Sequence, residues 1–488
     1  MSLPAAKPHQ WRLLIVVFFV VLAAYGVSPV VSNGDSYLVA PTSASIVNDF
    51  NLDISESIGP GTAGGIAWIG DGDSGVQTPG LSMTADPPVS EPVYDYFPWT
   101  TAMVGAVLYV VLLIPGALLG ISFFDPRRMV AEGDAGLFNL IGGSVLTALM
   151  VAIVAATVDQ IMAGRGADSR TRRRAVIATA LVVAFGTSAW SVLSRAMWSQ
   201  ATSTLLVALL FYEVVRLEQA APADRRPWGI ALGATAAIAY TARPTNAVSV
   251  VVVGAWLLVQ HRRQLLPYVV SGATVGAAWI AVNLATWSTL QPPYFSPERA
   301  APESYLLEAL AGNLISPNRG LLIFSPVALV AAVGAWTSLR EGRQRSLIVL
   351  GVCIVVTHWA LVSGAGEGWW AGSTYGPRFM ADIIPALAFL SVPAVAKLVS
   401  QRSERSTRLR RATLALAAVS VLMHAPGAWS KPASCWSLEP PRVDEDTSRV
   451  WDWDDLQALE PVRVVLDGGS VRDAVLRRCD HLLDTAPA

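Results

Sequence analysis

Apolar stretches recur along the whole chain, separated by shorter polar connectors. Most approach the roughly 20 residues that a helix needs to cross the hydrocarbon core of a bilayer, and the shorter ones need their flanking residues as well. The pattern therefore predicts eleven membrane-spanning helices. The stretches are Leu13–Val31, Leu137–Met162, Ala175–Ala189, Ala201–Val215, Trp228–Tyr240, Ala247–Val259, Leu266–Trp287, Leu321–Leu339, Leu347–Val362, Ala381–Ala396 and Ala412–Ala425.

The basic residues are concentrated in alternate connectors. Arg165–Arg174 holds five arginines and Lys397–Arg411 holds six basic residues, whereas Ser32–Pro98 has no Lys or Arg and nine acidic residues. Because basic connectors stay on the cytoplasmic side of a membrane, the first two are expected inside and Ser32–Pro98 outside. The N-terminus is then inside and the C-terminus outside.

One further apolar segment, Thr100–Ile121, breaks this alternation. A full crossing there would move the five-arginine connector to the outside, so we expect a helix that lies against the outer face or re-enters from it. The first stretch raises a separate question, because Leu13–Ala24 has the character of a signal-peptide core. It continues to Val31 without a small-residue cleavage site, which favours an uncleaved anchor.

Composition agrees with a membrane protein. Hydrophobic residues make up 53% of the chain and charged residues 15%, with a mean hydropathy of +0.47, whereas soluble domains carry roughly 25% charged residues. These values exclude a water-soluble enzyme and a disordered chain. The tail 429–488 differs in composition from the rest of the chain, because it is polar and contains twelve acidic residues. We expect residues 1–428 to form the transmembrane domain and 429–488 a small outer domain.

The chain has three cysteines. Cys353 lies inside a predicted span, where it is expected to be inert packing. Cys435 and Cys479 bracket the tail, in a compartment that permits disulfides. Because the tail is too small to bury much core, we expect a disulfide between Cys435 and Cys479.

Carboxylates follow the first span directly. Asp35 is held close to a helix end at membrane level, where it is suited to act as a general base or to bind a divalent cation such as Mg²⁺ or Mn²⁺. Asp49 and Asp53 follow in a looser part of the same connector. The alternative is that Asp35 is an ordinary solvated carboxylate, one of nine in this connector.

Four arginines fall at the outer ends of predicted spans, where an anion would be bound. An arginine at membrane depth should face protein or an anion, because insertion of one at a helix centre costs roughly 2.5–3.5 kcal/mol. Snorkelling to the interface or an ordinary turn is the alternative for some of them. The four are Arg195, Arg243, Arg319 and Arg378.

The segment Glu367–Phe379 is the richest in polar and aromatic chemistry. Trp369, Trp370 and Tyr375 provide faces on which a sugar ring can stack, and Glu367 adds a carboxylate. Arg378 is suited to grip a phosphate through paired N–H groups. An interfacial tryptophan belt with a structural arginine is the alternative.

The sequence contains no nucleotide-binding motif, neither G-x-x-x-x-G-K-[ST] nor G-x-G-x-x-G after a strand. Its five histidines are scattered, which argues against a zinc site. An enzyme that works outside the membrane without a nucleotide needs a donor delivered through the lipid phase. Polyprenyl-phosphate sugars meet that requirement, and nothing in the sequence indicates nucleic acid as a partner.

Together these features resemble the bacterial membrane glycosyltransferases of the GT-C superfamily, which include dolichyl-phosphate-mannose-dependent mannosyltransferases. The resemblance rests on five elements between Asn33 and Trp453. They are Gly34-Asp35, Trp190–Gln200, Thr241–Asn246, Ser316–Pro326 and Trp369–Phe379.

The resemblance implies an all-α polytopic fold and an inverting sugar transfer from a polyprenyl-phosphate donor to a glycan or glycolipid acceptor. It places the active site on the outer face of the bacterial inner membrane, and it gives Asp35 the catalytic role. The sequence departs from the family pattern at Trp198-Ser199-Gln200, where relatives often carry a histidine. It also lacks the Asp-Glu pair of protein O-mannosyltransferases after Gly34, so glycan or glycolipid extension is preferred to protein mannosylation.

Two other classes of protein remain open from the sequence. A lipid-linked sugar flippase would also span the membrane many times, although it would tend to carry polar residues in mid-span. A non-catalytic envelope-assembly protein is the second. A pocket that joins Asp35 to Arg378 would favour an enzyme, and their separation across the protein would favour a scaffold.

Overall fold

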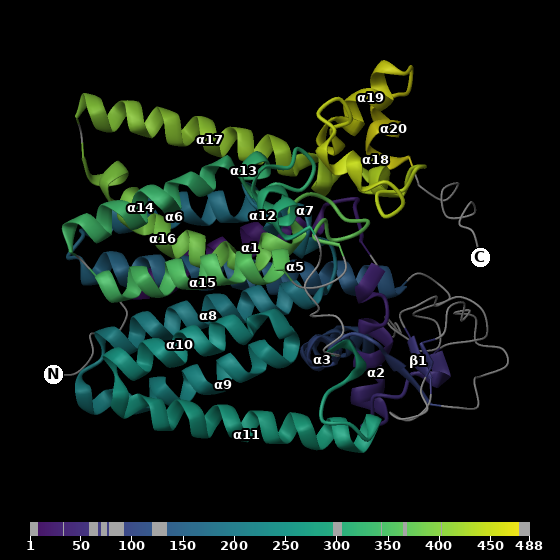
Figure 1. Ribbon diagram of the computed structural model, residues 1–488, viewed down its shortest axis with the longest axis horizontal. Helices are drawn as coiled ribbons and strands as arrows, with labels where there is room; N and C mark the ends of the chain where they lie inside the picture. Colours follow the sequence, from purple (N-terminus) through teal and green to yellow (C-terminus); the bar gives the residue numbers. More distant parts are fainter. Residues whose placement is uncertain are drawn as a thin grey trace.

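Helices dominate the protein, and eleven of the described ones lie side by side in one bundle (Figure 1). The computed structural model describes residues 8–32, 34–57, 67–69, 76–77, 92–119, 134–295, 305–342, 344–364, 368–401 and 403–477. Each predicted apolar stretch overlaps a helix of the bundle. These helices are α1 (Pro8–Gly26), α5 (Asp134–Gly164), α6 (Ser169–Phe185), α8 (Ser199–Gln219), α9 (Arg226–Ala242), α10 (Ala247–Gln260), α11 (Arg262–Trp287), α14 (Leu329–Glu341), α15 (Arg345–Gly364), α16 (Ile384–Ser400) and α17 (Glu404–Trp429).

Six of the described helices are individually long and apolar enough to cross a membrane. A seventh span results if α6 is joined to the short helices after it, α7 (Ser188–Ser191) and η3 (Leu193–Arg195), from which it is bent by 45°. Helices such as α10 and the apolar part of α1 are shorter than this standard. The protein is thus built as a multi-pass membrane protein, while the count of eleven spans stays a prediction.

The stretch Leu321–Leu339 is not one continuous helix, contrary to expectation. It is divided into α13 (Leu321–Phe324), η8 (Pro326–Ala328) and α14. The cause is local, because Pro326 has no N–H to donate back along the helix and its ring disfavours the helical conformation of Ser325. Ser325 accordingly leaves the helical region, with φ −127° and ψ 62°.

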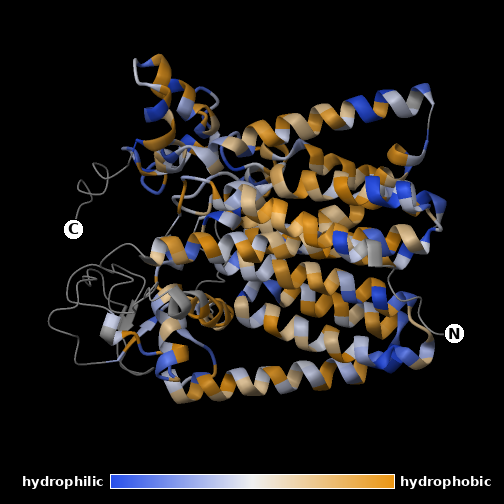
Figure 2. Cartoon of the chain, turned by 180° about the vertical axis from the view of Figure 1, so that it is seen from behind, coloured by the Kyte–Doolittle hydropathy of each residue, from blue (hydrophilic) through white to orange (hydrophobic). Residues whose placement is uncertain are grey.

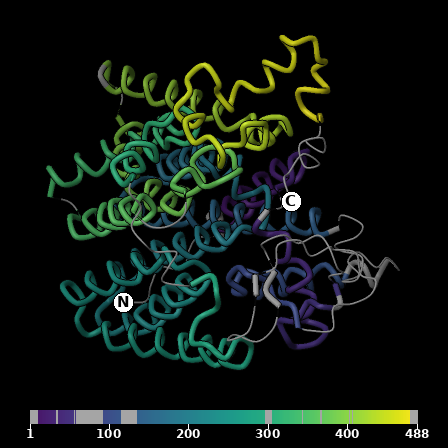
Figure 3. The backbone as a smooth tube through the Cα atoms, turned by 45° about the vertical axis from the view of Figure 1, so that its right-hand side comes forward, coloured from purple at the N-terminus to yellow at the C-terminus, as the bar shows by residue number. Residues whose placement is uncertain are grey.

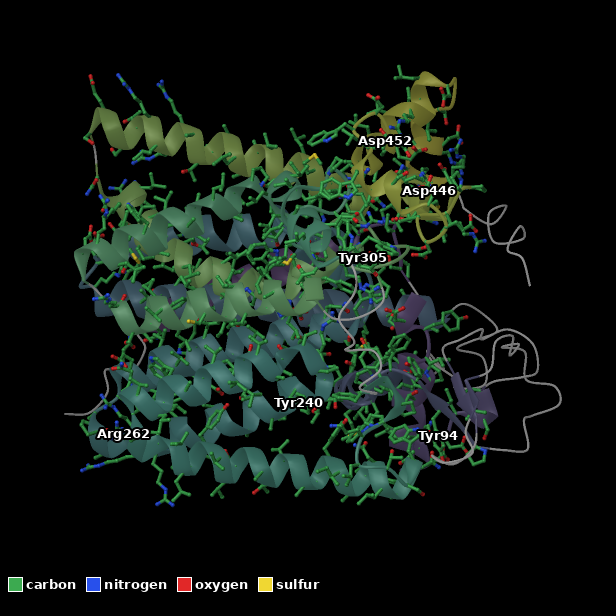
Figure 4. All side chains as sticks on the ribbon, in the orientation of Figure 1. Tyr94, Tyr240, Arg262, Tyr305, Asp446 and Asp452 are labelled. Atoms are coloured by element: carbon green, nitrogen blue, oxygen red, sulfur yellow. The ribbon has the colours of Figure 1, made fainter. Side chains whose placement is uncertain are left out.

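The two ends of the bundle differ in character. The basic connectors lie together at one end, where Arg262 is labelled, while Tyr94, Tyr305, Asp446 and Asp452 lie toward the opposite end (Figure 4). Hydrophilic residues are dense at the basic end, and the helices between the two ends are mostly hydrophobic (Figure 2). We refer to these as the basic end and the outer end.

The segments beyond the outer end include the predicted surface helix. Helix α3 (Thr100–Leu119) is seen nearly end-on in Figure 1, crosswise to the bundle, and it packs mainly against α2 (Val39–Asn48). Beside them is a small antiparallel sheet in the order β2-β1-β3, which makes the expected all-α class incomplete. Its strands are β1 (Ala67–Ile69), β2 (Val76–Gln77) and β3 (Val93–Asp95), with Trp68 opposite both Gln77 and Tyr94.

The C-terminal tail folds against the same end of the bundle (Figure 3). It contains α18 (Lys431–Cys435), α19 (Glu460–Leu466) and α20 (Val471–Leu476), and it packs beside α12 (Leu306–Ile315). Cys435 is disulfide-bonded and Cys353 is free. The predicted partner Cys479 lies outside the described residues, so its pairing with Cys435 stays a prediction.

The sidedness of the bundle can be tested with single cysteines at exposed positions of its two ends. In a Cys353→Ser background, Ser169→Cys in the basic connector and Ser448→Cys in the tail should react from opposite sides of the membrane with an impermeant maleimide. The reason is the retention of basic connectors on the cytoplasmic side. Labelling of both positions from one side would contradict the topology.

Candidate active site

The structure brings together two residues that are 343 positions apart in the chain. A guanidinium N–H of Arg378 donates to Oδ2 of Asp35 in a short ion pair at the outer end of the bundle. The side chain of Arg378 is 8% exposed and that of Asp35 is 38% exposed. The carboxylate is therefore reachable from outside, whereas the guanidinium is enclosed by protein.

Arg195 positions the segment that carries Asp35. Its Nη2 donates to the carbonyl of Tyr25 at 2.9 Å, and its own carbonyl accepts from the N–H of Ser32 at 3.1 Å. Its Nη1 reaches the carbonyl of Val30 at 3.5 Å. Arg195 is fully buried, so it fixes the chain between α1 and Asp35 and does not face a ligand space.

Arg378 begins the turn η9 (Arg378–Ile383) and stacks on an aromatic ring. Its guanidinium carbon lies 3.9 Å from the ring centroid of Trp198, the residue that precedes α8. The chain approaches Arg378 through Gly376, whose φ of +57° favours glycine, and a Cβ there would press on the ring of Phe324 at 3.0 Å. The cation–π contact thus holds Arg378 against the start of α8.

Three buried N–H donors around this contact have no hydrogen-bond partner among the described residues. They are Nε of Arg378, Nε1 of Trp198 and Nε2 of Gln200. In addition, no side chain caps the N-terminus of α8, where backbone N–H groups and the helix dipole favour negative charge. A buried unpaired donor is costly, and a group of donors is satisfied by an anion.

A second buried ion pair lies beside the first turn of α8. Nε of Arg243 is 3.0 Å from Oδ2 of Asp382, whose Oδ1 accepts from Ser203 at 2.5 Å. Nη1 of Arg243 donates to Ser199 at 3.3 Å, directly after Trp198. Arg243 and Arg378 therefore flank the residues Trp198 and Ser199 at the start of this helix.

Arg319 has a different surrounding from Arg378. Its guanidinium donates to the carbonyl of Trp370 at 2.7 Å, to Gln457 at 2.8 Å and to Ser437 at 2.9 Å. Burial lowers its pKa to about 9, so it stays charged at neutral pH. Its N–H groups are occupied by the 368–377 loop and the tail, and binding of a phosphate by Arg319 stays a prediction.

The neighbouring Asn318 is also hydrogen-bonded to the tail. Its side-chain amide donates to the carbonyls of Arg449, Asp452 and Asp455, and its oxygen accepts from the N–H of Gln457 at 2.8 Å. The segment Ser316–Arg319 therefore docks the tail onto the bundle.

The aromatic residues of the 368–377 loop are largely structural. Trp369 is buried against Trp436 and Trp451 of the tail, and a Cβ on Gly312 would lie 2.1 Å from its ring. Tyr375 is buried and donates to the carbonyl of Met423 at 2.6 Å. Both rings are buried, and the sugar-stacking surface stays a prediction. Trp370 is half-buried, and Glu367 lies outside the described residues.

Asp95 is a carboxylate near Asp35 that the sequence did not single out. It is buried at the end of β3, and burial raises its pKa to about 8, with its backbone hydrogen bond to Phe97 lowering the pKa and the charge of Asp35 raising it further. The carboxyl of Asp95 is thus largely protonated at pH 7.

Asp49 and Asp35 lie at opposite ends of α2. Asp49 lies exposed just after the C-terminal end of α2, a helix about 15 Å long at 1.5 Å per residue, while Asp35 precedes the other end. Among the described residues there is no group of three or more His, Cys, Asp or Glu side chains that could hold a metal ion. A divalent cation at Asp35 stays a prediction.

Comparison with known proteins reaches the fold through structure alone. No family model and no curated protein sequence matches the chain. Among solved structures it is similar to ArnT from Cupriavidus metallidurans bound to undecaprenyl phosphate, with a TM-score of 0.53 and 15% identity over 98% of this chain and 76% of ArnT. The chain has the GT-C fold.

A second solved structure extends the GT-C likeness. It is the Archaeoglobus fulgidus oligosaccharyltransferase tethered to an acceptor peptide that contains the NVT sequon, with a TM-score of 0.51 and 10% identity. The alignment covers 97% of this chain and 63% of the oligosaccharyltransferase. The ArnT structure in the apo state aligns over 89% of this chain with a TM-score of 0.52. The resemblance inferred from the sequence is confirmed for the fold.

The role of Arg319 can be tested by removing its charge while keeping its length. Arg319→Met should lower the free energy of unfolding by about 3–5 kcal/mol, because it leaves buried acceptors of the loop and tail unpaired. Limited proteolysis of the tail and thermal unfolding in detergent would measure the effect. Arg340→Met, at the basic end, is the control, and an equal small change in both variants would contradict the docking role.

Asp95 should make the stability of the protein depend on pH. The folded protein binds a proton with a pKa of about 8, whereas the unfolded chain releases it near pH 3.8. The contribution is therefore complete below about pH 4 and is lost as pH rises toward 8, with a slope of at most about 1.4 kcal/mol per pH unit.

The Asp95→Asn variant keeps the acceptor for the Phe97 N–H and removes the titration. Its unfolding temperature should exceed that of the unmodified protein by a margin that grows between pH 5 and pH 8. A constant difference across this range, measured by thermal unfolding in detergent, would show that Asp95 is ionised in the folded state.

Proposed function

We propose that the protein is a glycosyltransferase that moves a sugar from a polyprenyl-phosphate donor to a glycan or glycolipid acceptor, with inversion, at the outer face of a bacterial inner membrane. The main support is the group of buried, unpaired N–H donors around Arg378, next to the accessible carboxylate of Asp35. ArnT, which has the same fold, is bound to undecaprenyl phosphate in one structure. Asp35 and Arg378 form an ion pair and are therefore not separated across the protein, as they would be in a scaffold.

The donor phosphate is assigned to the start of α8. There it would accept from Arg378, from the N-terminal N–H groups of the helix and from the side chains of Trp198 and Gln200. Arg243 lies on the other side of Ser199 and adds positive charge. An arginine fork is suited to phosphate oxygens, and a helix N-terminus binds them without a side-chain charge.

Binding of a phosphate would also release the base. In the free protein Arg378 donates to Asp35, whereas the donor phosphodiester, with one negative charge shared by two oxygens, competes for the same N–H groups. Asp35 then turns its carboxylate to the acceptor hydroxyl. Its 38% exposure gives an acceptor access from outside.

The chemical step follows from these positions. Asp35 takes the proton from the acceptor hydroxyl as the oxygen forms a bond to the anomeric carbon. The bond between that carbon and the phosphate oxygen breaks, and its electron pair leaves on the phosphate. Arg378 and the α8 N-terminus stabilise the charge that develops there. Asp95, held protonated by burial, does not compete with Asp35 for the positive charge.

Arg195 and Arg319 act as scaffold in this proposal. Arg195 fixes the chain before Asp35, and Arg319 fixes the loop before Arg378. Trp370, half-buried in that loop with its Nε1 bonded to Asp444 at 2.7 Å, is the aromatic residue left to contact a sugar.

The proposal is tested by separating donor binding from turnover. Asp35→Asn should lower turnover by about 10²–10⁴-fold while donor binding survives, because it removes the base and keeps the shape. Arg378→Lys keeps the charge and loses the fork, so it should weaken donor binding at least tenfold. The measurements are transfer of radiolabel from defined polyprenyl-phosphate sugars by purified protein and equilibrium binding of the donor.

Asp49→Asn is the matched control, since it changes an exposed carboxylate of the same connector at the far end of α2. Normal turnover in Asp35→Asn with loss in Asp49→Asn would move the base to Asp49. Normal turnover in both variants would contradict the assignment of a glycosyltransferase to this site.

A further inference from the structure

A large apolar groove runs along the bundle, away from the Asp35–Arg378 pair. It has a volume of about 920 Å³ and lies between α6, α14, α16 and α17, with η8, α7 and α13 at its outer end. Its walls are alanine, valine, leucine and isoleucine side chains with a few hydroxyls. Arg174 and Arg410 are the charged residues among those that line it.

The groove exists because α17 is attached to the rest of the bundle mainly near its outer end. There His424 is hydrogen-bonded to Ser191 at 2.7 Å and to Ser325 at 2.8 Å, and Ser420 accepts from the N–H of Val327 at 3.2 Å. Only 22% of the apolar 18-residue stretch of α17 is buried inside the protein. These bonds close the groove toward the outer end of the bundle. Toward the basic end the groove is open to the lipid phase.

Both arginines lie at that basic end. Arg174 is exposed in the first turns of α6, next to Arg173, and Arg410 is exposed in the first turns of α17. Nη2 of Arg410 donates to the carbonyls of Leu398 and Gln401, at 2.7 and 3.3 Å, which holds the guanidinium over the last turn of α16. Two cations therefore stand at the mouth of an apolar space, with no acidic side chain among the lining residues.

Along α17 the groove is about as long as one leaflet is thick. From Arg410 to Val421 the lining spans twelve residues of this helix, or about 16 Å over eleven steps of 1.5 Å, and half of a hydrocarbon core is about 15 Å. None of Asp35, Arg243, Arg378 and Trp198 lines it. Its charge is at the end opposite to the site proposed for the donor phosphate, so it does not suit that donor.

We propose that this groove binds an anionic phospholipid of the leaflet at the basic end, with its phosphate between Arg174 and Arg410 and an acyl chain along α17. Basic pockets between membrane helices on this side are suited to such headgroups. The lipid fills the space between α17 and α6, α14 and α16, and so supports the helix whose end carries the tail. This site is separate from the proposed transfer reaction and does not depend on it.

The test uses the full-length protein, purified in detergent and stripped of lipid. Phosphatidylglycerol and phosphatidylcholine with identical acyl chains are titrated, and bound lipid is counted by native mass spectrometry. The expected result is preferential binding of phosphatidylglycerol. In Arg174→Gln/Arg410→Gln this binding should be weakened roughly 10- to 30-fold, because each basic residue near an anionic lipid contributes about 1 kcal/mol to the binding free energy.

The matched control is Arg173→Gln/Arg411→Gln, which removes the same charges from neighbouring exposed positions that do not line the groove. Its phosphatidylglycerol affinity should stay within about twofold of the unmodified protein. An equal loss in both double variants would overturn the proposal, because it would show general attraction to the basic surface.

A second pair of variants leaves Arg410 and its bonds to α16 in place. Ala418→Trp fills the groove and should abolish binding, whereas Ala415→Trp, on the exposed face of α17 outside the groove, should not. Phosphatidylglycerol with a photoreactive acyl chain should label peptides of α6 and α17. Labelling elsewhere, or displacement by undecaprenyl phosphate at equal affinity, would overturn the assignment.

Discussion

A guanidinium enclosed by protein has to find acceptors for its N–H groups, and this constraint organises the outer end of the bundle. Arg195 and Arg319 find theirs largely in backbone carbonyls and neutral side chains. Arg378 and Arg243 face carboxylates, those of Asp35 and Asp382. An arginine held by carbonyls is fixed in place, whereas one held by a carboxylate can exchange that partner for another anion.

Because their partners differ, the four arginines have different structural roles. The carbonyl-bound pair anchors the two segments that lead to Asp35 and Arg378, one after α1 and one before η9. The carboxylate-bound pair flanks the N-terminus of α8, whose helix dipole adds to the same positive field. Pre-positioned donors of this kind act on a developing charge without having to reorganise.

Much of this arrangement could be predicted from local features of the sequence. The segregation of basic residues predicted that the basic connectors lie at one end of the bundle, and the run of apolar stretches predicted its helices. Asp35 and Arg378 were identified because each sits in a polar segment beside a span. The role of Arg319 could not be predicted, because it depends on Gln457 and Ser437, more than a hundred residues further along the chain. Nothing in the sequence distinguished Asp95 from the other acidic residues of its connector, because its burial results from packing around β3. Asp382 did carry a signal, as the single acidic residue in the apolar stretch Ala381–Ala396.

The docking of the tail on Asn318 and Arg319 has a consequence for how the protein is made. These two residues leave the ribosome more than a hundred positions before their partners in 437–457, so for that interval their polar groups have to remain hydrated or be held by other factors. A chain interrupted before the tail would keep a charged arginine in an unfinished pocket next to the membrane. Such a chain would expose unpaired polar groups to quality-control proteases, and cells would accumulate little of it even if every membrane helix had been inserted.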